Sequence, residues 1–173
     1  PPIDWTQTIT NTEPPNAQGV AATWGKFGSV TISSATVAPT EGEYQAGLWW
    51  SYSHQDEWLF TPSFTVPMDS YLYFDSYVFL GSNAGDHYYV KASTDNGQNW
   101  TVLWDASAQT GGWNYYTTPI TISLADYVGQ ELKLAFHAID PPSNDGLWYT
   151  WFIDGIYIGN EYDVIRFSPE ELT

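Results

Sequence analysis

Hydrophobic and polar residues alternate in short runs along this chain, and no apolar helical period lasts for about ten residues. β-Branched and aromatic runs recur instead, separated by Gly, Pro, Asn and Asp. This pattern is typical of strands in a sandwich or barrel. It predicts strands near Ser29–Ser33, Gly47–Ser53, Trp58–Val66, Tyr71–Phe79, His87–Ser93, Trp100–Asp105, Trp113–Ile122, Glu131–Ile139 and Tyr149–Ile158. The only helical candidate is a short turn at Ser123–Val128, which Gly129 ends.

Strands at this spacing indicate an all-β, two-sheet antiparallel β-sandwich. Because side chains alternate along a strand, each strand turns one face to the core and one face elsewhere. In Tyr71–Phe79, the core face holds Leu72, Phe74 and Val78, and the second face holds Tyr71, Tyr73, Tyr77 and Phe79. Such second faces are rich in rings and poor in charge. We expect a shallow ligand surface there, or a face covered by a loop or neighbouring domain.

The segment from Ser93 to Trp100 matches the Asp-box pattern S-x-D-x-G-x-x-W. Asp95 is placed to bond turn amides, Gly97 to take a positive φ, and Trp100 to pack beneath the hairpin. A single Asp box is a turn stabiliser, so it predicts a hairpin and no chemistry.

Composition then narrows the function. Aromatic residues make up 18% of the chain, with ten Trp, so some rings should lie on the surface, where they serve recognition. The net charge is −16, which makes nucleic acid and anionic membranes poor partners. Such acidity is typical of a soluble extracellular protein, a halotolerant protein or one that binds divalent cations. Cysteine is absent, and no apolar run is long enough for membrane insertion.

Carbohydrate binding fits this composition, because sugar rings stack on Trp and Tyr while nearby polar groups bond their hydroxyls. Our candidate ligand-binding residues are the rings of the second strand faces and of two ring-rich loops: Tyr71, Tyr73, Tyr77, Tyr89, Trp113, Tyr115, Trp49 and Trp148. The alternative for each ring is that it fills the second sheet face or packs on a loop.

Calcium is the candidate cofactor, since it takes six to eight oxygen ligands. Asp154 stands in an apolar strand, where an unpaired carboxylate is costly and a calcium ion or turn amides would relieve that cost. Asp56 and Glu57 are candidate partners from a distant strand, and Asp145 from an oxygen-rich loop. The alternative is a set of solvated loop acids.

Catalytic patterns are missing. The three histidines stand on separate segments without H-E-x-x-H spacing, and no G-x-S-x-G elbow occurs. Glycosidases of jelly-roll type usually carry two carboxylates on one strand, which this chain lacks. A catalytic pair of carboxylates from distant strands, such as Glu131 with Asp75, stays open as the less favoured hypothesis. We therefore expect no enzyme activity.

Five segments in order resemble the cleaved-adhesin and choice-of-anchor J domains, which are related in architecture to MAM domains: Gln55–Pro62, Tyr71–Phe74, Tyr88–Gly97, Ile122–Phe136 and Trp151–Ile158. The last is like the family's closing W-x-I-D-D-V-x-I strand, with Gly155 in place of the second Asp. The family's opening F-E-x-G is not recognisable. Both departures fall where such domains often place calcium ligands.

The resemblance implies jelly-roll topology and a secreted or cell-surface, modular, non-catalytic domain linked to adhesion and structural calcium. We expect residues 1–160 to form the binding module, and residues 161–173 to be an acidic linker or the start of a following domain. Our hypothesis is a calcium-stabilised module that binds a glycan or a protein surface for a larger protein, beside neighbouring domains of the parent chain. The alternatives are a structural spacer next to a secreted peptidase or glycosidase, and a jelly-roll glycosidase or lyase.

Overall fold

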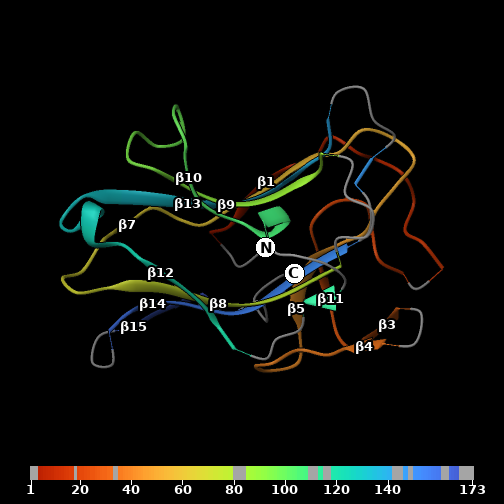
Figure 1. Cartoon of the computed structure of the whole chain (residues 1–173), viewed down its shortest axis with the longest axis horizontal. Coiled ribbons are helices and arrows are strands. Elements are labelled where there is room, and N and C mark those ends of the chain that lie inside the picture. The colour runs from red at the N-terminus through yellow and green to blue at the C-terminus, as the bar shows by residue number, and fades with distance from the viewer. Residues whose placement is uncertain are drawn as a thin grey trace.

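The computed structural model describes residues 4–17, 19–32, 35–79, 85–108, 113–114, 118–141, 146–147, 150–160 and 164–167. These residues form a sandwich of two antiparallel sheets, seen edge-on in Figure 1. Sheet A has the order β1 (Thr6–Thr8), β6 (Asp56–Phe60), β13 (Glu131–Ile139), β9 (His87–Ser93) and β10 (Thr101–Asp105), with β7 (Phe64–Thr65) also paired to β13. The all-β, two-sheet prediction is confirmed.

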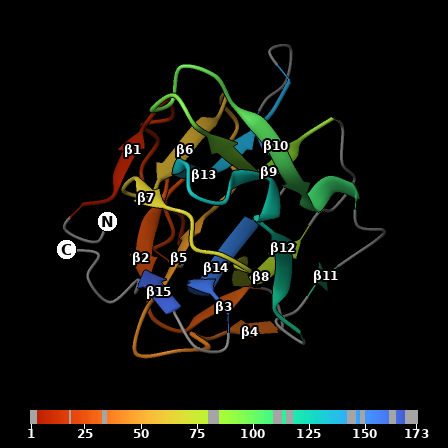
Figure 2. The ribbon, with the colours of Figure 1, turned by 90° about the vertical axis from the view of Figure 1, so that its left-hand side faces the viewer.

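Sheet B has the order β11 (Trp113–Asn114), β8 (Tyr71–Phe79), β14 (Thr150–Gly159), β5 (Gln45–Leu48) and β2 (Gly25–Phe27), with β12 (Ile120–Ser123) on β8 and β15 (Val164–Phe167) on β14. A separate hairpin, β3 (Val30–Ile32) and β4 (Ala35–Val37), lies on the side of sheet B away from sheet A (Figure 2). The helical elements of the described part are two 3-10 turns, η1 (Ala106–Ala108) and η2 (Ala125–Tyr127). No helix there is long and apolar enough to cross a membrane.

The two sheets are held together by a core of alternating strand residues with Trp151 at its centre. The Trp151 ring is fully buried and lies 5.2 Å from Trp24, 5.8 Å from Tyr88 and 6.0 Å from Phe136, measured between ring centroids. Its indole N–H donates to the Ser76 hydroxyl at 3.0 Å. Burying a ring of this size is a large apolar contribution, and the hydrogen bond avoids an unpaired polar atom.

A bulge in β14 decides which side chains of that strand face the core. The register against β8 shifts between Asp154 and Tyr157, so Ile153 and Ile156 both reach the core although they are three residues apart. Gly155 makes this possible, because its φ is +55° and a Cβ there would lie 2.7 Å from Asp75 Oδ2. The glycine that departs from the family pattern is therefore needed by the local backbone.

The outer face of sheet B is partly covered, which corrects one site prediction. The β3–β4 hairpin brings Val30, Ile32 and Val37 over Tyr77 and Phe152 in a second apolar cluster. Tyr77 is only 2% exposed as a result. Its prediction as a ligand-binding residue was wrong, because sequence alternation places it on the outer face without revealing the hairpin that covers that face.

The long strands agree best with the sequence. β8, β9 and β13 have the predicted bounds, and the predicted core face of β8 is buried. β5 ends at Leu48, earlier than predicted, because the Gln55 side chain bonds the backbone of the next segment: it donates to the Trp49 carbonyl at 2.8 Å and accepts from the Ser51 amide at 3.0 Å. Within the segment expected to be a linker, Val164–Phe167 forms β15 and pairs with β14.

Candidate ligand-binding site

The outer face of sheet A gathers rings and hydrogen-bonding groups from neighbouring strands. Period-two alternation sends Leu59 and Phe136 into the core and their neighbours outward. Pairing then sets Trp58 directly opposite His137, and His137 opposite Tyr89. We name the resulting group the Trp58 cluster and define it by its six members: Trp58, Phe60, Tyr89, Lys91, Trp100 and His137.

The rings of the Trp58 cluster contact one another in a continuous group. Trp58 stacks on His137 at 3.6 Å between centroids and 12° between planes. Trp58 and Phe60 are 5.6 Å apart, and Trp100 lies 5.6 Å from each of them. Trp58, Phe60, Tyr89 and Trp100 are all partly exposed, so the group offers apolar surface to solvent on a rigid sheet.

A chain of hydrogen bonds runs through the centre of the cluster. Lys91 Nζ lies 2.8 Å from His137 Nδ1, and His137 Nε2 lies 2.7 Å from Asp56 Oδ1. Since an ammonium only donates, Nδ1 is the acceptor and Nε2 carries the proton that it donates to Asp56. The Trp58 indole donates to the same Asp56 oxygen at 2.7 Å. Both ring nitrogens of His137 are thus engaged, which leaves no lone pair for a general base.

The ionisation of this network follows from its burial. Burial and the charge of Lys91 together lower the pKa of His137 to about 4, against the opposing effect of Asp56. Burial also lowers the pKa of Lys91, although Asp56 and Asp105 oppose this shift. His137 is therefore neutral at pH 7 and Lys91 carries the positive charge. That charge lies 4.6 Å from the centroids of both Trp58 and Tyr89, within cation–π range.

Further polar groups border the cluster. His87 Nδ1 lies 2.9 Å from Asp105 Oδ2, and the His87 ring stacks on Tyr89 at 4.8 Å. The His87 side chain is 41% exposed and that of Asp105 is 21% exposed. Rings with hydrogen-bonding groups at their edges are the combination that binds polar ligands with apolar faces.

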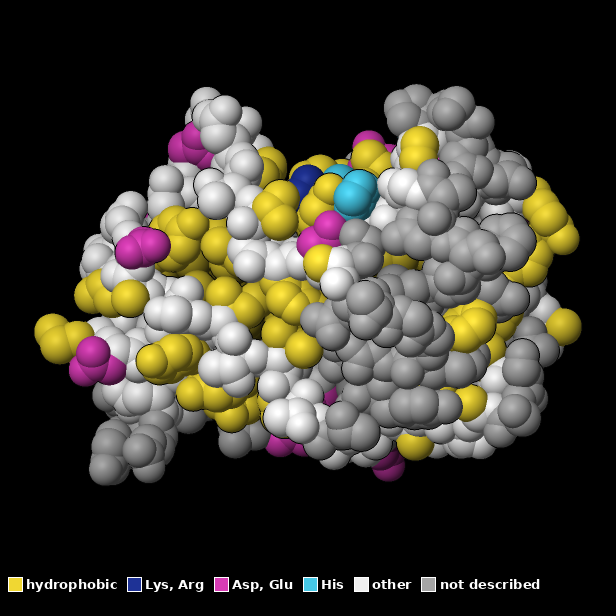
Figure 3. All heavy atoms as spheres, in the orientation of Figure 1, with side chains coloured by type: hydrophobic (Ala, Val, Ile, Leu, Met, Phe, Trp, Pro, Cys, Tyr) yellow, Lys and Arg dark blue, Asp and Glu magenta, His cyan; other side chains and the backbone are white. Residues whose placement is uncertain are grey.

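The β9–β10 hairpin stands beside the cluster and is built by the predicted Asp box. Asp95 accepts from the Gln98 amide at 3.0 Å and the Asn99 amide at 2.9 Å, and bonds to Asn99 help lower its pKa to about 2. Gly97 has a φ of +91°, and its carbonyl accepts from the Trp100 indole at 3.1 Å. Figure 3 shows the upper surface hollowed beside this hairpin, with basic, histidine and hydrophobic side chains in the hollow.

The predicted ligand-binding residues do not form one surface. Tyr89 belongs to the Trp58 cluster on sheet A. Tyr71 and Tyr73 lie on the opposite side of the molecule, on the outer face of sheet B, where Tyr73 stacks on Tyr157 at 4.5 Å. Trp49 lines a separate pocket. The Trp113 side chain, Tyr115 and Trp148 lie outside the described residues.

The predicted calcium ligands are also separated. Asp56 belongs to the His137 network on the outer side of sheet A. Glu57 points the other way, is fully buried and accepts from the amides of Thr10 at 3.0 Å and Asn11 at 2.6 Å. Asp154 lies in sheet B. Asp145 is outside the described residues.

Asp154 is the residue that best tests the fit of calcium. Its Oδ2 accepts from the Thr40 amide at 2.6 Å, the Glu41 amide at 3.0 Å and the Thr40 hydroxyl at 3.2 Å, while Oδ1 is buried without a hydrogen bond of good geometry. Burial raises its pKa, and the amides of Glu41, Gly155 and Thr40 oppose that shift. A carboxylate surrounded by N–H donors is stabilised by hydrogen bonds, whereas calcium needs oxygens, so the contacts of Asp154 Oδ2 are those of a hydrogen-bonded carboxylate. Within the described residues, no group of three or more acidic or histidine side chains could hold a metal ion.

The open carboxylate pair of Glu131 and Asp75 is not formed. Glu131 is an exposed residue of β13 in sheet A, and Asp75 lies on β8 in sheet B, where its Oδ2 accepts from the Thr40 hydroxyl at 2.6 Å. The two side chains face opposite sides of the sandwich. A glycosidase that used this pair is therefore excluded.

Sequence reasoning missed five of the six cluster members as site residues. Trp58 entered only as the start of a predicted strand and as part of a family-like segment, and Trp100 only as the start of a strand and a turn residue. The available signal was the shared period of two in Asp56-x-Trp58-x-Phe60 and His87-x-Tyr89-x-Lys91. Whether the side chains of these two segments come together depends on strand register, which sequence spacing does not specify.

No protein-family model matches the sequence, and no curated protein matches it either. The K1 cleaved adhesin domain of Lys-gingipain (Kgp) from Porphyromonas gingivalis W83 is similar in structure, with 19% identity, 91% of each chain covered and a TM-score of 0.56. The K3 domain of that protein is 18% identical, with 92% of this chain and 93% of that chain covered and a TM-score of 0.51. This chain has the cleaved-adhesin fold.

The expected resemblance to cleaved adhesin domains is thus confirmed at the level of the fold. TmCBM61, solved in complex with β-1,4-galactotriose, is more distant: 19% identity, 70% of this chain and 74% of that chain covered, and a TM-score of 0.45. The cleaved-adhesin fold places the Trp58 cluster on the outer face of one sheet, and the function of that face follows from its own side chains.

Proposed function

We propose that this chain is a non-catalytic glycan-binding module of a secreted or cell-surface protein, and that the Trp58 cluster is its binding site. The observation that supports this most is the contact of Trp58, Phe60 and Trp100 in one partly exposed group beside charged and histidine side chains. Rings would stack on the apolar faces of sugar residues, while Lys91 and the Asp56 and Asp105 carboxylates bond their hydroxyls.

The geometry favours a glycan over an extended peptide. The cluster lies across the middle strands β6, β13 and β9, which are already paired on both sides, so no free strand edge is offered for β-addition. Opposite charges are close together, with Lys91 between Asp56 and Asp105. The hydroxyls of a neutral oligosaccharide both donate and accept, so they can bond the carboxylates as well as the ammonium group.

The first test is a glycan array with the whole chain, followed by calorimetric titration of the best ligand with Trp58→Ala. Loss of a central ring should weaken binding at least about tenfold, equal to about 1.4 kcal/mol. Tyr71→Ala is the matched control, because that ring is 40% exposed on the opposite sheet. Circular dichroism of both variants checks that the fold is kept.

The outcomes separate the alternatives. If the wild-type chain binds no glycan on the array, the glycan proposal is wrong and the structural spacer gains support. Binding that Trp58→Ala leaves intact would move the site elsewhere on the molecule. Release of reducing ends from any bound polysaccharide would contradict the proposed lack of catalysis. Calcium stabilisation stays a prediction, because its predicted ligand Asp145 lies outside the described residues.

A further inference from the structure

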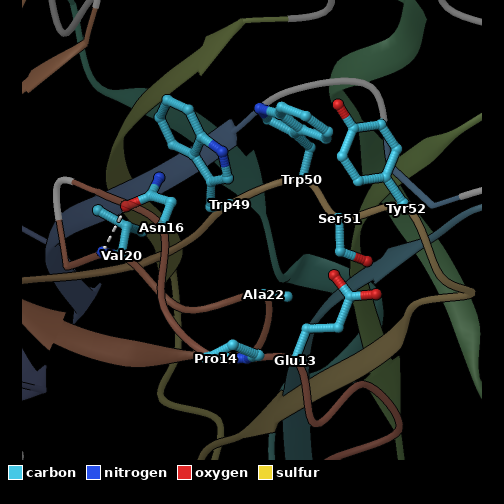
Figure 4. A pocket seen from close by; sticks show the side chains of 9 residues that line it. All are labelled: Glu13, Pro14, Asn16, Val20, Ala22, Trp49, Trp50, Ser51 and Tyr52. Carbon is cyan, nitrogen blue, oxygen red and sulfur yellow. Dashed lines mark hydrogen bonds between the residues drawn. The ribbon is translucent and has the colours of Figure 1, made fainter.

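A small pocket lies apart from the Trp58 cluster, where the chain leaves β5. Its volume is about 160 Å³, below the range of roughly 300–1,000 Å³ that is usual for drug-sized ligands. Figure 4 shows the rings of Trp49, Trp50 and Tyr52 along one side and Glu13 with Ser51 on the other. The pocket therefore suits a compact chemical group.

The aromatic side of the pocket is rigid although it belongs to a loop. The buried Gln55 side chain bonds the backbone at Trp49 and Ser51, and the Trp49 amide donates to the Ala21 carbonyl at 2.8 Å. Tyr52 is 74% exposed, and its ring stands at 89° to that of Trp50, with 4.7 Å between centroids. An exposed tyrosine on such a firmly held loop is ready to contact a ligand at little entropic cost.

The polar side of the pocket is dominated by one carboxylate. In the described part of the chain, no lysine, arginine or histidine lies within ion-pair distance of Glu13, whose Oε1 accepts from the Ser53 hydroxyl at 2.5 Å. The Ser51 hydroxyl is already engaged, because it accepts from Asn11 Nδ2 at 2.6 Å and donates to the Ser53 carbonyl at 2.7 Å. A sugar, with several hydroxyls to satisfy, would find few partners here.

Three rings and one carboxylate without a cationic partner are the surroundings that a cation with apolar substituents requires. The net charge of −16 adds attraction for cations over the whole surface. We propose that this pocket binds a small organic cation, namely an alkylated or quaternary ammonium group. Its alkyl groups contact Trp50 and Tyr52, and its charge faces Glu13. The site is separate from the Trp58 cluster and does not depend on the glycan proposal.

The test uses choline as the probe and its neutral isostere 3,3-dimethylbutan-1-ol as the matched ligand control. Indole N–H signals of the whole chain are followed by NMR, with the Trp50 signal assigned by its loss in Trp50→Phe. Choline should shift this signal saturably, and the neutral isostere should bind at least about tenfold more weakly. Glu13→Gln should weaken choline binding about tenfold, and Tyr52→Ala about fivefold.

Two controls tie the result to the pocket. Trp58→Ala should leave choline binding unchanged, so failure of the glycan proposal and failure of this one are distinguishable. Binding should weaken at high ionic strength, because Glu13 is partly open to solvent. The proposal is overturned if choline does not shift Trp50, if the neutral isostere binds equally well, or if Glu13→Gln has no effect. Preferential binding of methyl glucoside in the pocket would overturn it as well.

Discussion

His137 shows how a single side chain can be polar, buried and structural at once. It is 3% exposed, stacked on Trp58 and bonded at both ring nitrogens. In the unfolded chain a histidine takes up a proton near pH 6.5, whereas burial lowers the native pKa to about 4. Because the native state binds fewer protons in this interval, the contribution of His137 to stability is complete above pH 6.5 and is lost as the pH falls towards 4.

This linkage gives a prediction for His137→Gln, which keeps an acceptor for Lys91 and a donor for Asp56 but does not titrate. The stability advantage of the wild type over the variant should shrink by about 2–3 kcal/mol between pH 7 and pH 4. Urea unfolding of both proteins across this range measures it, and carboxylates common to both cancel in the difference. A difference that stays constant with pH would contradict the buried, neutral histidine.

At the level of elements, the turn of the β9–β10 hairpin positions Trp100, which belongs to the candidate site. Gly97→Ala forces a residue with a side chain into φ +91° and brings its Cβ to 3.3 Å from Trp100 Cζ2. We expect a loss of about 1–2 kcal/mol of stability and weaker glycan binding, because the Trp100 ring must shift from its position beside Trp58. Urea unfolding and calorimetry measure the two effects. Gln98→Ala, an exposed change in the same turn, is the control, and equal behaviour of the two variants would refute the argument.

The same elements show what sequence can and cannot specify. The period of two located the core residues Leu72, Phe74 and Val78 of β8 correctly, because alternation is a local property of a strand. The Asp-box turn was predictable for the same reason. The Trp58 cluster was not, since the pairing of Trp58 with His137 joins segments 79 residues apart in the chain, as their numbers show, and depends on register. Tyr77 was misassigned because the hairpin that covers it is another non-local contact.

For the whole molecule, the imbalance of twenty acidic against four basic residues governs the response to ions. Screening of this repulsion should raise the melting temperature by a few degrees between about 10 mM and about 500 mM NaCl. Neutral glycan binding by the Trp58 cluster should change little over this range, whereas choline binding in the Glu13 pocket should weaken. Equal salt responses of the two ligands would contradict the division into a site for a neutral ligand and a site for a cation.

The charge imbalance also determines which controls a test of calcium binding needs. Any divalent cation screens acidic repulsion, so a higher melting temperature in CaCl₂ does not by itself indicate a site. A site whose Kd lies a hundredfold below the calcium concentration adds about 2.7 kcal/mol. The calcium prediction therefore requires an increase in melting temperature that MgCl₂ and NaCl at equal ionic strength do not reproduce and that EDTA reverses.

Because Asp154 is stabilised by the amides of Thr40 and Glu41, Asp154→Asn should destabilise the fold equally with and without calcium. A loss confined to calcium-containing buffer would instead assign Asp154 to a metal site.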